Sequence, residues 1–307
     1  MDKLLTMSEK EISKFEIMQR LKGKVAVVTG ASRGGGRGIA LVLGEGGATV
    51  YVTGRSVRGA STRPDLPGTT IEDTAEQVTT RGGVGIPIRC DHTVDAEVEA
   101  LFERVGQEHG QLDILVNNAW GGYEQYDDET FDAPFWEQPL WRWDKMFVAG
   151  VRAQYTASRF AVPLMMSQRQ GLIINTTACD PRGKYLGNLP YDLAKTVINR
   201  MAYGLALELR AYNIVAIALS PGWMRTEDVL RRFKTDEQNW YKVHALRHTE
   251  STQYVGRAVA ALAADPKVME KSGLLLIVGD LARGYGFTDI DGRYVPPFRI
   301  PKENLMD

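Results

Sequence analysis

The stretch TGASRGGGRGIA occupies residues 29–40 of the chain. It follows the apolar, β-branched run KVAVVT at 24–29 and leads into a helical pattern that starts at Arg37. A glycine-rich turn that ends a strand and opens a helix is typical of a dinucleotide phosphate site, because a pyrophosphate can approach the glycine backbone and the unpaired N–H groups of the helix. A turn rich in glycine only for its dihedral angles is the alternative. The cofactor-binding residues predicted here are Gly30, Ser32, Arg33, Gly34 and Gly36.

Apolar runs recur along the chain, and each is followed by a longer helical pattern. The runs lack apolar–polar alternation, which is typical of strands covered on both faces. The order of strands and helices implies right-handed crossovers between parallel strands. The sequence therefore predicts an α/β fold with a single-domain, Rossmann-like, doubly wound parallel sheet of about seven strands. The predicted strands are 24–29, 48–53, 84–89, 112–116, 171–176, 214–219 and 274–278.

Both ends of the chain look like additions to this core. We expect an N-terminal extension at 1–22, a dinucleotide-binding catalytic domain at 23–286 and a C-terminal tail at 287–307. The tail is rich in proline and cannot sustain a helix. A polar loop at 56–70 is longer than the usual link between a strand and a helix, which is typical of a loop that borders a site.

The composition excludes several classes of partner. The chain of 307 residues has 37 Lys plus Arg against 38 Asp plus Glu, so its formal net charge of −1 creates no field that attracts nucleic acid or an anionic membrane. Its apolar runs are shorter than the ~18–20 residues that span a bilayer. Cys90 and Cys179 make no disulfide framework, and no signal sequence is legible. We therefore expect a cytoplasmic protein with neither nucleic-acid nor membrane partners.

His244 and His248 have the spacing of a zinc ligand pair. No third ligand is evident near them, so a solvated helix face is the favoured interpretation and no metal is expected.

The end of the second predicted strand reads Thr53-Gly54-Arg55-Ser56. An NAD site would place Asp or Glu here to bind the ribose 2′-hydroxyl, and neither is present. Arg55 and the loop residue Arg33 instead offer two guanidinium groups that suit a 2′-phosphate. Each arginine alone is typical of an ordinary surface charge, but the two together favour NADP(H) over NAD(H).

Further motifs follow the predicted strands in a fixed order. They are T-G-x-x-x-G-x-G at 29–36, Asn117-Asn118-Ala119, Y-x-x-x-K at 191–195, and Pro221-Gly222 with Thr226. Together they resemble the short-chain dehydrogenase/reductase family over about residues 23–280. The tail at 280–293 and W-D-x-x-x-x-x-G at 143–150 are similar to the branch called dehydrogenase/reductase family member one.

The resemblance implies further cofactor contacts. Asp91 would bind the adenine amino group and Thr226 the nicotinamide carboxamide, whereas Asn117 would brace the fourth strand. The implied cofactor-binding residues are Asp91, Asn118, Ala119, Tyr191, Lys195, Pro221, Gly222 and Thr226.

Tyr191 and Lys195 are the candidate catalytic pair. The resemblance implies that Tyr191 is the general acid-base and that Lys195 activates it. The spacing of the two residues is consistent with these roles, because residues four apart lie on the same face of a helix. A cation beside the phenol, together with the positive nicotinamide, would favour the phenolate and lower the pKa of Tyr191 from its ordinary ~10 toward the operating pH. A core tyrosine with a solvated lysine is the alternative outside this context.

The chain departs from the family pattern at two positions. The substrate-orienting serine of the family lies thirteen residues before the tyrosine, and this chain has Ala178 there. The helix asparagine of the family corresponds to Gly150, for which we expect a packing or water-accommodating reason. We predict that Thr177 supplies the missing hydroxyl through a one-residue bulge. The alternative, given equal weight, is that Thr177 only makes a local hydrogen bond and that the site works with Tyr191 alone.

Aromatic residues are frequent in the loops expected around the substrate. Such loops indicate an apolar carbonyl or alcohol substrate, although packing at a lid or at a subunit interface is equally consistent with them. The loop after the fourth strand carries Trp120, Tyr123, Tyr126, Phe131, Phe135, Trp136 and Trp141. Trp120, Tyr185 and Trp223 are the predicted substrate residues.

The sequence thus predicts an NADP(H)-dependent oxidoreductase that moves a hydride between nicotinamide and a hydrophobic carbonyl or alcohol. An NADP(H)-binding sensor with little turnover is the alternative, motivated by Ala178. A homodimer or homotetramer is expected from the resemblance.

Overall fold

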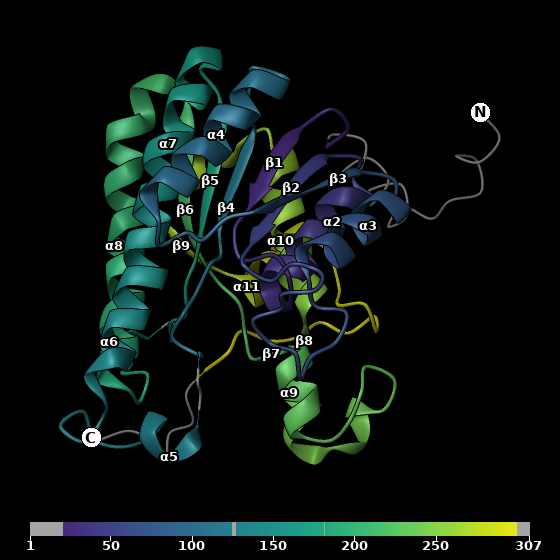
Figure 1. Ribbon diagram of the computed structural model, residues 1–307, viewed down its shortest axis with the longest axis vertical. Helices are drawn as coiled ribbons and strands as arrows, with labels where there is room; N and C mark the ends of the chain where they lie inside the picture. The colour runs from purple at the N-terminus through teal and green to yellow at the C-terminus, as the bar shows by residue number, and fades with distance from the viewer. Residues whose placement is uncertain (1–20, 125–126, 181, 300–307) are drawn as a thin grey trace.

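Seven parallel strands form one sheet in the computed structural model, which describes residues 21–124, 127–180 and 182–299 (Figure 1). Their spatial order is β3-β2-β1-β4-β5-β6-β9. The strands are β1 (Val25–Val28), β2 (Thr49–Gly54), β3 (Val84–Arg89), β4 (Ile114–Asn117), β5 (Gly171–Thr176), β6 (Ile214–Ser220) and β9 (Leu275–Ile277). Each overlaps a predicted apolar run, with β2, β4 and β6 ending one residue beyond it, and the predicted fold class is confirmed.

Helices cover both faces of the sheet (Figure 1). One face packs against α2 (Gly34–Glu45), α3 (Ile71–Thr80), α10 (Thr252–Ala264) and α11 (Val278–Tyr285), and the other against α4 (Asp95–His109), α7 (Ala153–Gln168) and α8 (Leu189–Leu209). Strand β1 illustrates why the runs are apolar without interruption. Ala26 and Val28 pack on the first face, while Val25 and Val27 pack on the second. Both sets of side chains are therefore removed from water.

The strand order reverses between β1 and β4, because the chain leaves β3 at the edge and crosses to the far side of β1. Ligands of such sheets bind in the crevice at this reversal, outside the carboxyl ends of the strands. The segments after β1 and β4 are therefore the expected place for a cofactor. The edge position of β3 also explains why it tolerates Pro87.

The segment between β6 and α10 contains two short strands that the sequence did not predict. They are β7 (Met224–Arg225) and β8 (Glu250–Ser251), which pair in parallel. The Arg225 guanidinium is buried, donates to the Glu237 carboxylate at 2.7 Å and lies 4.0 Å from the Trp240 ring centroid. These contacts fix the chain that follows β6.

Short helices complete the described chain. They are α5 (Asp128–Phe131), α6 (Leu140–Met146), a π-helical segment (Phe147–Arg152), α9 (Glu227–Arg232) and 3₁₀ turns at Arg210–Tyr212, Trp240–Lys242, His244–His248 and Val268–Lys271. Among the residues that the structure describes, no helix combines the length and apolarity needed to cross a membrane.

The two predicted additions contact the core where they are described. Residues 1–20 and 300–307 lie outside the described residues. Leu21 is fully buried, and Val295 of the tail packs in the same cluster as α10 and α11. The Asp289 carboxylate accepts a hydrogen bond of 2.8 Å from the Ser251 backbone N–H.

Helices α2 and α10 approach closely at Gly38. A Cβ on Gly38 would lie 1.9 Å from the Thr252 carbonyl oxygen. Gly38→Ala is therefore expected to lower the free energy of unfolding by about 1–3 kcal/mol, the usual cost of overpacking. Gly284→Ala is the control, because its Cβ would enter open space and alanine favours the helix by up to about 1 kcal/mol. Urea unfolding measures both, and equal stability of the two variants would contradict this packing.

Candidate active site

The loop after β1 touches the end of β4 through glycine. Gly30 has φ +64°, and a Cβ there would lie 2.8 Å from the Ala119 Cα. A Cβ on Gly36 would lie 2.4 Å from the Gly30 carbonyl oxygen. The turn at 30–36 can therefore close against β4 only because these positions carry no side chain.

Hydrogen bonds lock the same two segments together. The Thr29 hydroxyl accepts from the backbone N–H groups of Asn118 and Ala119, both at 2.9 Å. The Asn118 side-chain amide donates to the carbonyls of Thr29 and Gly30 at 3.0 and 3.1 Å. Asn118, one of the implied cofactor-binding residues, therefore also braces the glycine loop. Asn117 is buried and donates to Asn175 on β5 at 2.8 Å, which is the bracing that the resemblance implies.

A carboxylate caps the first turn of α2. The Gly34 N–H donates to the Glu227 carboxylate at 2.8 Å, and a Glu227 oxygen lies 3.8 Å from the Arg37 guanidinium. Glu227 begins α9, directly after Thr226, whose hydroxyl accepts from the Val229 N–H. The start of α2 therefore receives negative charge, as the unpaired N–H groups of a helix N-terminus favour. Sequence reasoning did not single out Glu227, because it comes from 193 residues further along the chain.

Arginine side chains converge beside the glycine loop. Arg33 donates to hydroxyl groups, with distances of 2.7 Å to Thr62 and 3.4 Å to Thr69. Its own burial lowers the pKa of the Arg33 guanidinium, and the charges of Arg63 and Arg55 lower it further. Groups of like charge thus lie close enough to affect one another, which is an arrangement that an anion would stabilise. Arg63 was not predicted, but it belongs to the long polar loop at 56–70, whose length was its signal.

The two other arginines have carboxylate partners. Arg55 pairs with Glu124 and lies 3.9 Å from Asp91, while Arg63 pairs with Asp228 at 2.5 Å. Burial pushes the pKa of Asp91 upward, but hydrogen bonds from Thr93 and the charge of Arg55 outweigh it, and the pKa is lowered. Asp91 is therefore a carboxylate at the end of β3.

Tyr191 and Lys195 lie in the first two turns of α8. The Asn188 side chain caps this helix by accepting from the Tyr191 N–H at 2.9 Å. The Asn188 amide also donates to the Phe131 carbonyl at 2.7 Å, which ties the loop after β4 to the start of α8. The pair is thus held by a rigid helix whose first turn is fixed from outside.

The Lys195 ammonium lies over the ring of Trp120, 3.5 Å from the ring centroid and 5.4 Å from that of Tyr191. Lys195 is buried, and burial lowers its pKa to about 7. The cation–π contact offers the charge a partner in place of water.

The side chains around Tyr191 favour the neutral phenol. Burial raises the pKa of Tyr191 well above 10, and the neighbouring Tyr123 raises it further. The Lys195 ammonium lies over the Trp120 indole, so the lowering of this pKa by the lysine together with a positive nicotinamide stays a prediction.

Trp120 explains the glycine at position 150. A Cβ on Gly150 would lie 2.5 Å from the Trp120 ring. Gly150 lies in the π-helical segment Phe147–Arg152, a type of irregularity that is frequent at functional sites. The packing reason expected for this departure is confirmed, because the indole takes the space of a side chain.

The structure does not bring the Thr177 hydroxyl to Tyr191. Thr177 is buried, and its hydroxyl donates to the Lys195 backbone carbonyl at 3.1 Å. The β5–β6 register is unbroken to Thr176, and the Thr177 N–H still bonds Leu219, so no bulge turns the side chain around. The alternative, a local hydrogen bond, describes Thr177, and its predicted role is therefore withdrawn.

Tyr191 instead shares a hydrogen bond with another phenol. The hydroxyls of Tyr123 and Tyr191 are 3.0 Å apart. Phe131 and Trp120 pack edge-on against Tyr191 at centroid distances of 6.0 and 5.6 Å. Tyr123 was noted only as one aromatic of its loop, and Tyr126 lies outside the described residues.

The other predicted substrate residues border different loops. Tyr185 follows β5 and Trp223 follows β6, and both side chains are exposed. Gly222 lies against Glu250, since a Cβ there would be 2.7 Å from a carboxylate oxygen. Burial raises the pKa of Glu250 to about 8.

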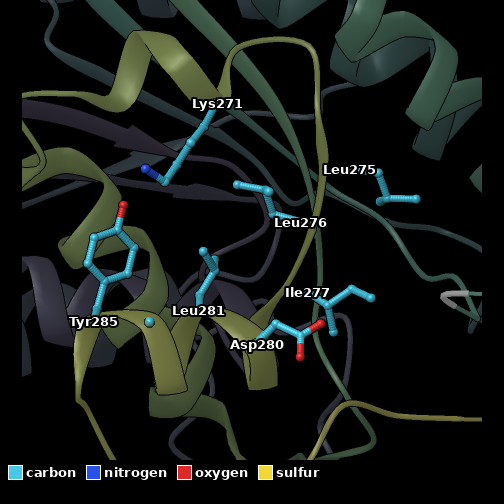
Figure 2. A pocket seen from close by; sticks show the side chains of 8 residues that line it. Lys271, Leu275, Leu276, Ile277, Asp280, Leu281 and Tyr285 are labelled. Carbon is cyan, nitrogen blue, oxygen red and sulfur yellow. The ribbon is translucent and has the colours of Figure 1, made fainter.

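A surface hollow of about 350 Å³ lies elsewhere, between β9 and α11. Figure 2 shows the side chains of Lys271, Leu276, Asp280 and Tyr285 around it. None of the predicted site residues lines it.

Comparisons with known proteins agree with the fold and the motifs. The family described as short chain dehydrogenase matches residues 24–237. The chain is 39% identical to Dehydrogenase/reductase SDR family member 1 of Mus musculus over 285 residues, which covers 91% of this chain and 87% of the mouse protein.

Solved structures are similar over most of the chain. A short chain dehydrogenase of Mycobacterium thermoresistibile has a TM-score of 0.74 at 26% identity and covers 92% of this chain and 95% of its own. A 7α-hydroxysteroid dehydrogenase in complex with NADH and 7-oxo glycochenodeoxycholic acid has a TM-score of 0.67 at 25% identity, with coverages of 86% and 95%. The chain therefore belongs to the short chain dehydrogenase family, whose members are oxidoreductases that use a nicotinamide cofactor, NAD(P)(H).

Proposed function

We propose that this protein is an NADP(H)-dependent oxidoreductase that acts on a hydrophobic carbonyl or secondary alcohol. The observation that carries the proposal is the pairing of the half-buried Tyr191 with the buried Lys195. Aromatic side chains surround the pair, and the neighbouring glycine loop already binds a carboxylate. Small molecules with a large apolar surface fit such a wall.

The residues after β1 suit a dinucleotide. Gly30 and Gly36 leave room for a pyrophosphate, and the Gly34 N–H donates to an anionic oxygen. Arg33, Arg55 and Arg63 would hold a 2′-phosphate, since Arg33 has hydroxyl partners and no direct carboxylate among its described hydrogen bonds. The further proposed cofactor residues are Ser32, Asp91, Asn118, Ala119, Tyr191, Lys195, Pro221, Gly222 and Thr226.

Side chains of the protein carry out the proton transfer. The bound nicotinamide supplies or accepts the hydride. Tyr191 gives its hydroxyl proton to the substrate oxygen in reduction and takes it back in oxidation. The Lys195 ammonium stabilises the resulting phenolate, and its pKa of about 7 lets it exchange protons near neutral pH.

The substrate would lie between Trp120, Tyr185 and Trp223. The 7-oxo glycochenodeoxycholic acid bound in the 7α-hydroxysteroid dehydrogenase structure described above combines a large apolar body with a ketone. We also propose a homodimer or homotetramer, since Tyr155 on α7 and Tyr203 and Leu207 on α8 are exposed.

NADPH is expected to bind more tightly than NADH. Arg33→Met should weaken NADPH binding by about 10- to 100-fold, the value of a hydrogen bond to a charged group, and should leave NADH binding nearly unchanged. Arg55→Asp should reverse or abolish the preference. Arg104→Met on the exposed face of α4 is the control, and titration of cofactor fluorescence measures all four proteins. Equal NADPH and NADH affinities of the natural chain would refute the preference.

Glu227 is expected to compete with the cofactor for the Gly34 N–H. Glu227→Gln keeps the size of the side chain and removes its charge, so NADP(H) should bind about three- to tenfold more tightly, as charges at helix N-termini are worth about 1 kcal/mol. Glu99→Gln on α4 removes an equal charge from an exposed position and should change nothing. Weaker binding by Glu227→Gln would show instead that the carboxylate assists the site.

Turnover is expected to need the Tyr191 phenol. Tyr191→Phe should lower kcat by about 10²- to 10⁴-fold, the usual contribution of a proton donor, at unchanged NADPH affinity. The measurement is a screen of ketones, aldehydes and alcohols with NADPH and NADP⁺, followed by kinetics on the best substrate. Tight NADPH binding without turnover of any compound by the natural chain would favour the sensor alternative.

A further inference from the structure

We propose that Tyr123 is a second catalytic residue, whose hydroxyl donates a hydrogen bond to the substrate oxygen beside Tyr191. The inference rests on the proposed function, because it assigns a role within the same proton-transfer site.

The first argument is contact with the reacting group. The Tyr123 hydroxyl lies 3.0 Å from the Tyr191 hydroxyl, the atom that would exchange a proton with substrate. Their rings are tilted by 32° at a centroid distance of 6.1 Å, so both phenols end at the same place. A substrate oxygen that enters between the two hydroxyls would therefore contact both.

The second argument is the support of the Tyr123 ring. It packs against Trp120 and Phe131 at centroid distances of 6.1 and 6.2 Å. Phe131 is tied to the cap of α8 through the Asn188 amide, and Trp120 lies under the Lys195 ammonium. The ring is thus held by the same residues that hold the Tyr191–Lys195 pair.

The third argument is access. Half of the Tyr123 surface (50%) is exposed, whereas its hydroxyl is turned against Tyr191, where burial raises the pKa of Tyr123. A substrate oxygen therefore reaches the hydroxyl by entering between the two phenols. Thr177 and Ala178 at the end of β5 offer no competing hydroxyl, because Thr177 is bound to the Lys195 carbonyl and alanine has none.

The chemistry needs such a donor. When a hydride adds to a carbonyl carbon, the C=O electron pair moves onto oxygen, which then takes the Tyr191 proton. A carbonyl oxygen accepts two hydrogen bonds, so it can lie between two phenols after a small displacement of either ring. Tyr123 keeps its proton and stabilises the developing negative charge, whereas Tyr191 gives its proton away. The reverse sequence oxidises an alcohol.

The test compares Tyr123→Phe with Tyr212→Phe, which removes a hydroxyl from the turn before β6, at the opposite end of the sheet from the site. Tyr123→Phe should lower kcat by about 10²-fold, the usual value of one preorganised donor, while NADPH affinity and the thermal midpoint stay unchanged. Tyr212→Phe should keep the kcat of the natural chain. An unchanged or increased kcat in Tyr123→Phe would overturn the inference and would indicate that Tyr123 only covers the site.

An equilibrium readout separates polarisation from any effect on folding. The infrared C=O stretch of a substrate ketone is measured in complex with the enzyme and NADP⁺, in which no hydride is available. The natural chain should shift this band to lower frequency, and Tyr123→Phe should lose a large part of the shift. Equal shifts in both proteins would refute the inference even if kcat fell. If the natural chain itself reduces no carbonyl, the proposed function fails first, and the inference fails with it.

Discussion

The closeness of two backbone segments is the constraint on which the site depends. The loop after β1 meets the end of β4 where Gly30 lies against Ala119, and a Cβ on Gly30 would not fit there. The Thr29 hydroxyl accepts hydrogen bonds from the two backbone N–H groups that follow β4. The contact aims the first turn of α2 at the reversal point of the sheet and fixes where the loop toward Trp120 and Tyr123 begins. A shift of this contact would move the phosphate end and the chemical end of the site together.

Charge and burial are distributed unevenly along that site. The end proposed to hold the phosphates contains arginines and the N-terminus of α2. In this structure acidic side chains bind these groups: Glu227 accepts from the helix N-terminus, and Glu124 and Asp228 form ion pairs with Arg55 and Arg63. At the other end of the site, the Lys195 ammonium lies on the Trp120 indole. Burial lowers the pKa of Lys195 and raises that of Tyr191, so the surroundings of this pair disfavour both charged forms.

The sequence predicts well those features that depend on residues adjacent in the chain. The seven strands follow from apolar runs, and the glycine loop follows from its place between β1 and α2. Gly150 was recognised as a departure with a packing reason, but its partner Trp120 could not be named, because the two are joined only by the fold. Glu227 was missed for the same reason. Arg63 and Tyr123 lie in loops that the sequence marks as bordering the site, but their partners could not be named. For Thr177 the sequence-based prediction was wrong. It assigned the hydroxyl missing at Ala178 to the preceding residue, whereas the regular strand directs the Thr177 side chain to the Lys195 carbonyl.

The interlocking of Trp120 with Gly150 constrains how this chain can diverge. Any side chain at 150 collides with the indole, and a smaller residue at 120 would leave a void under the Lys195 ammonium. A substitution at one of the two positions is therefore expected to require a compensating substitution at the other. A larger residue at 150 would need a smaller one at 120, so that a side chain from the helix fills the space beneath the lysine that the indole fills here.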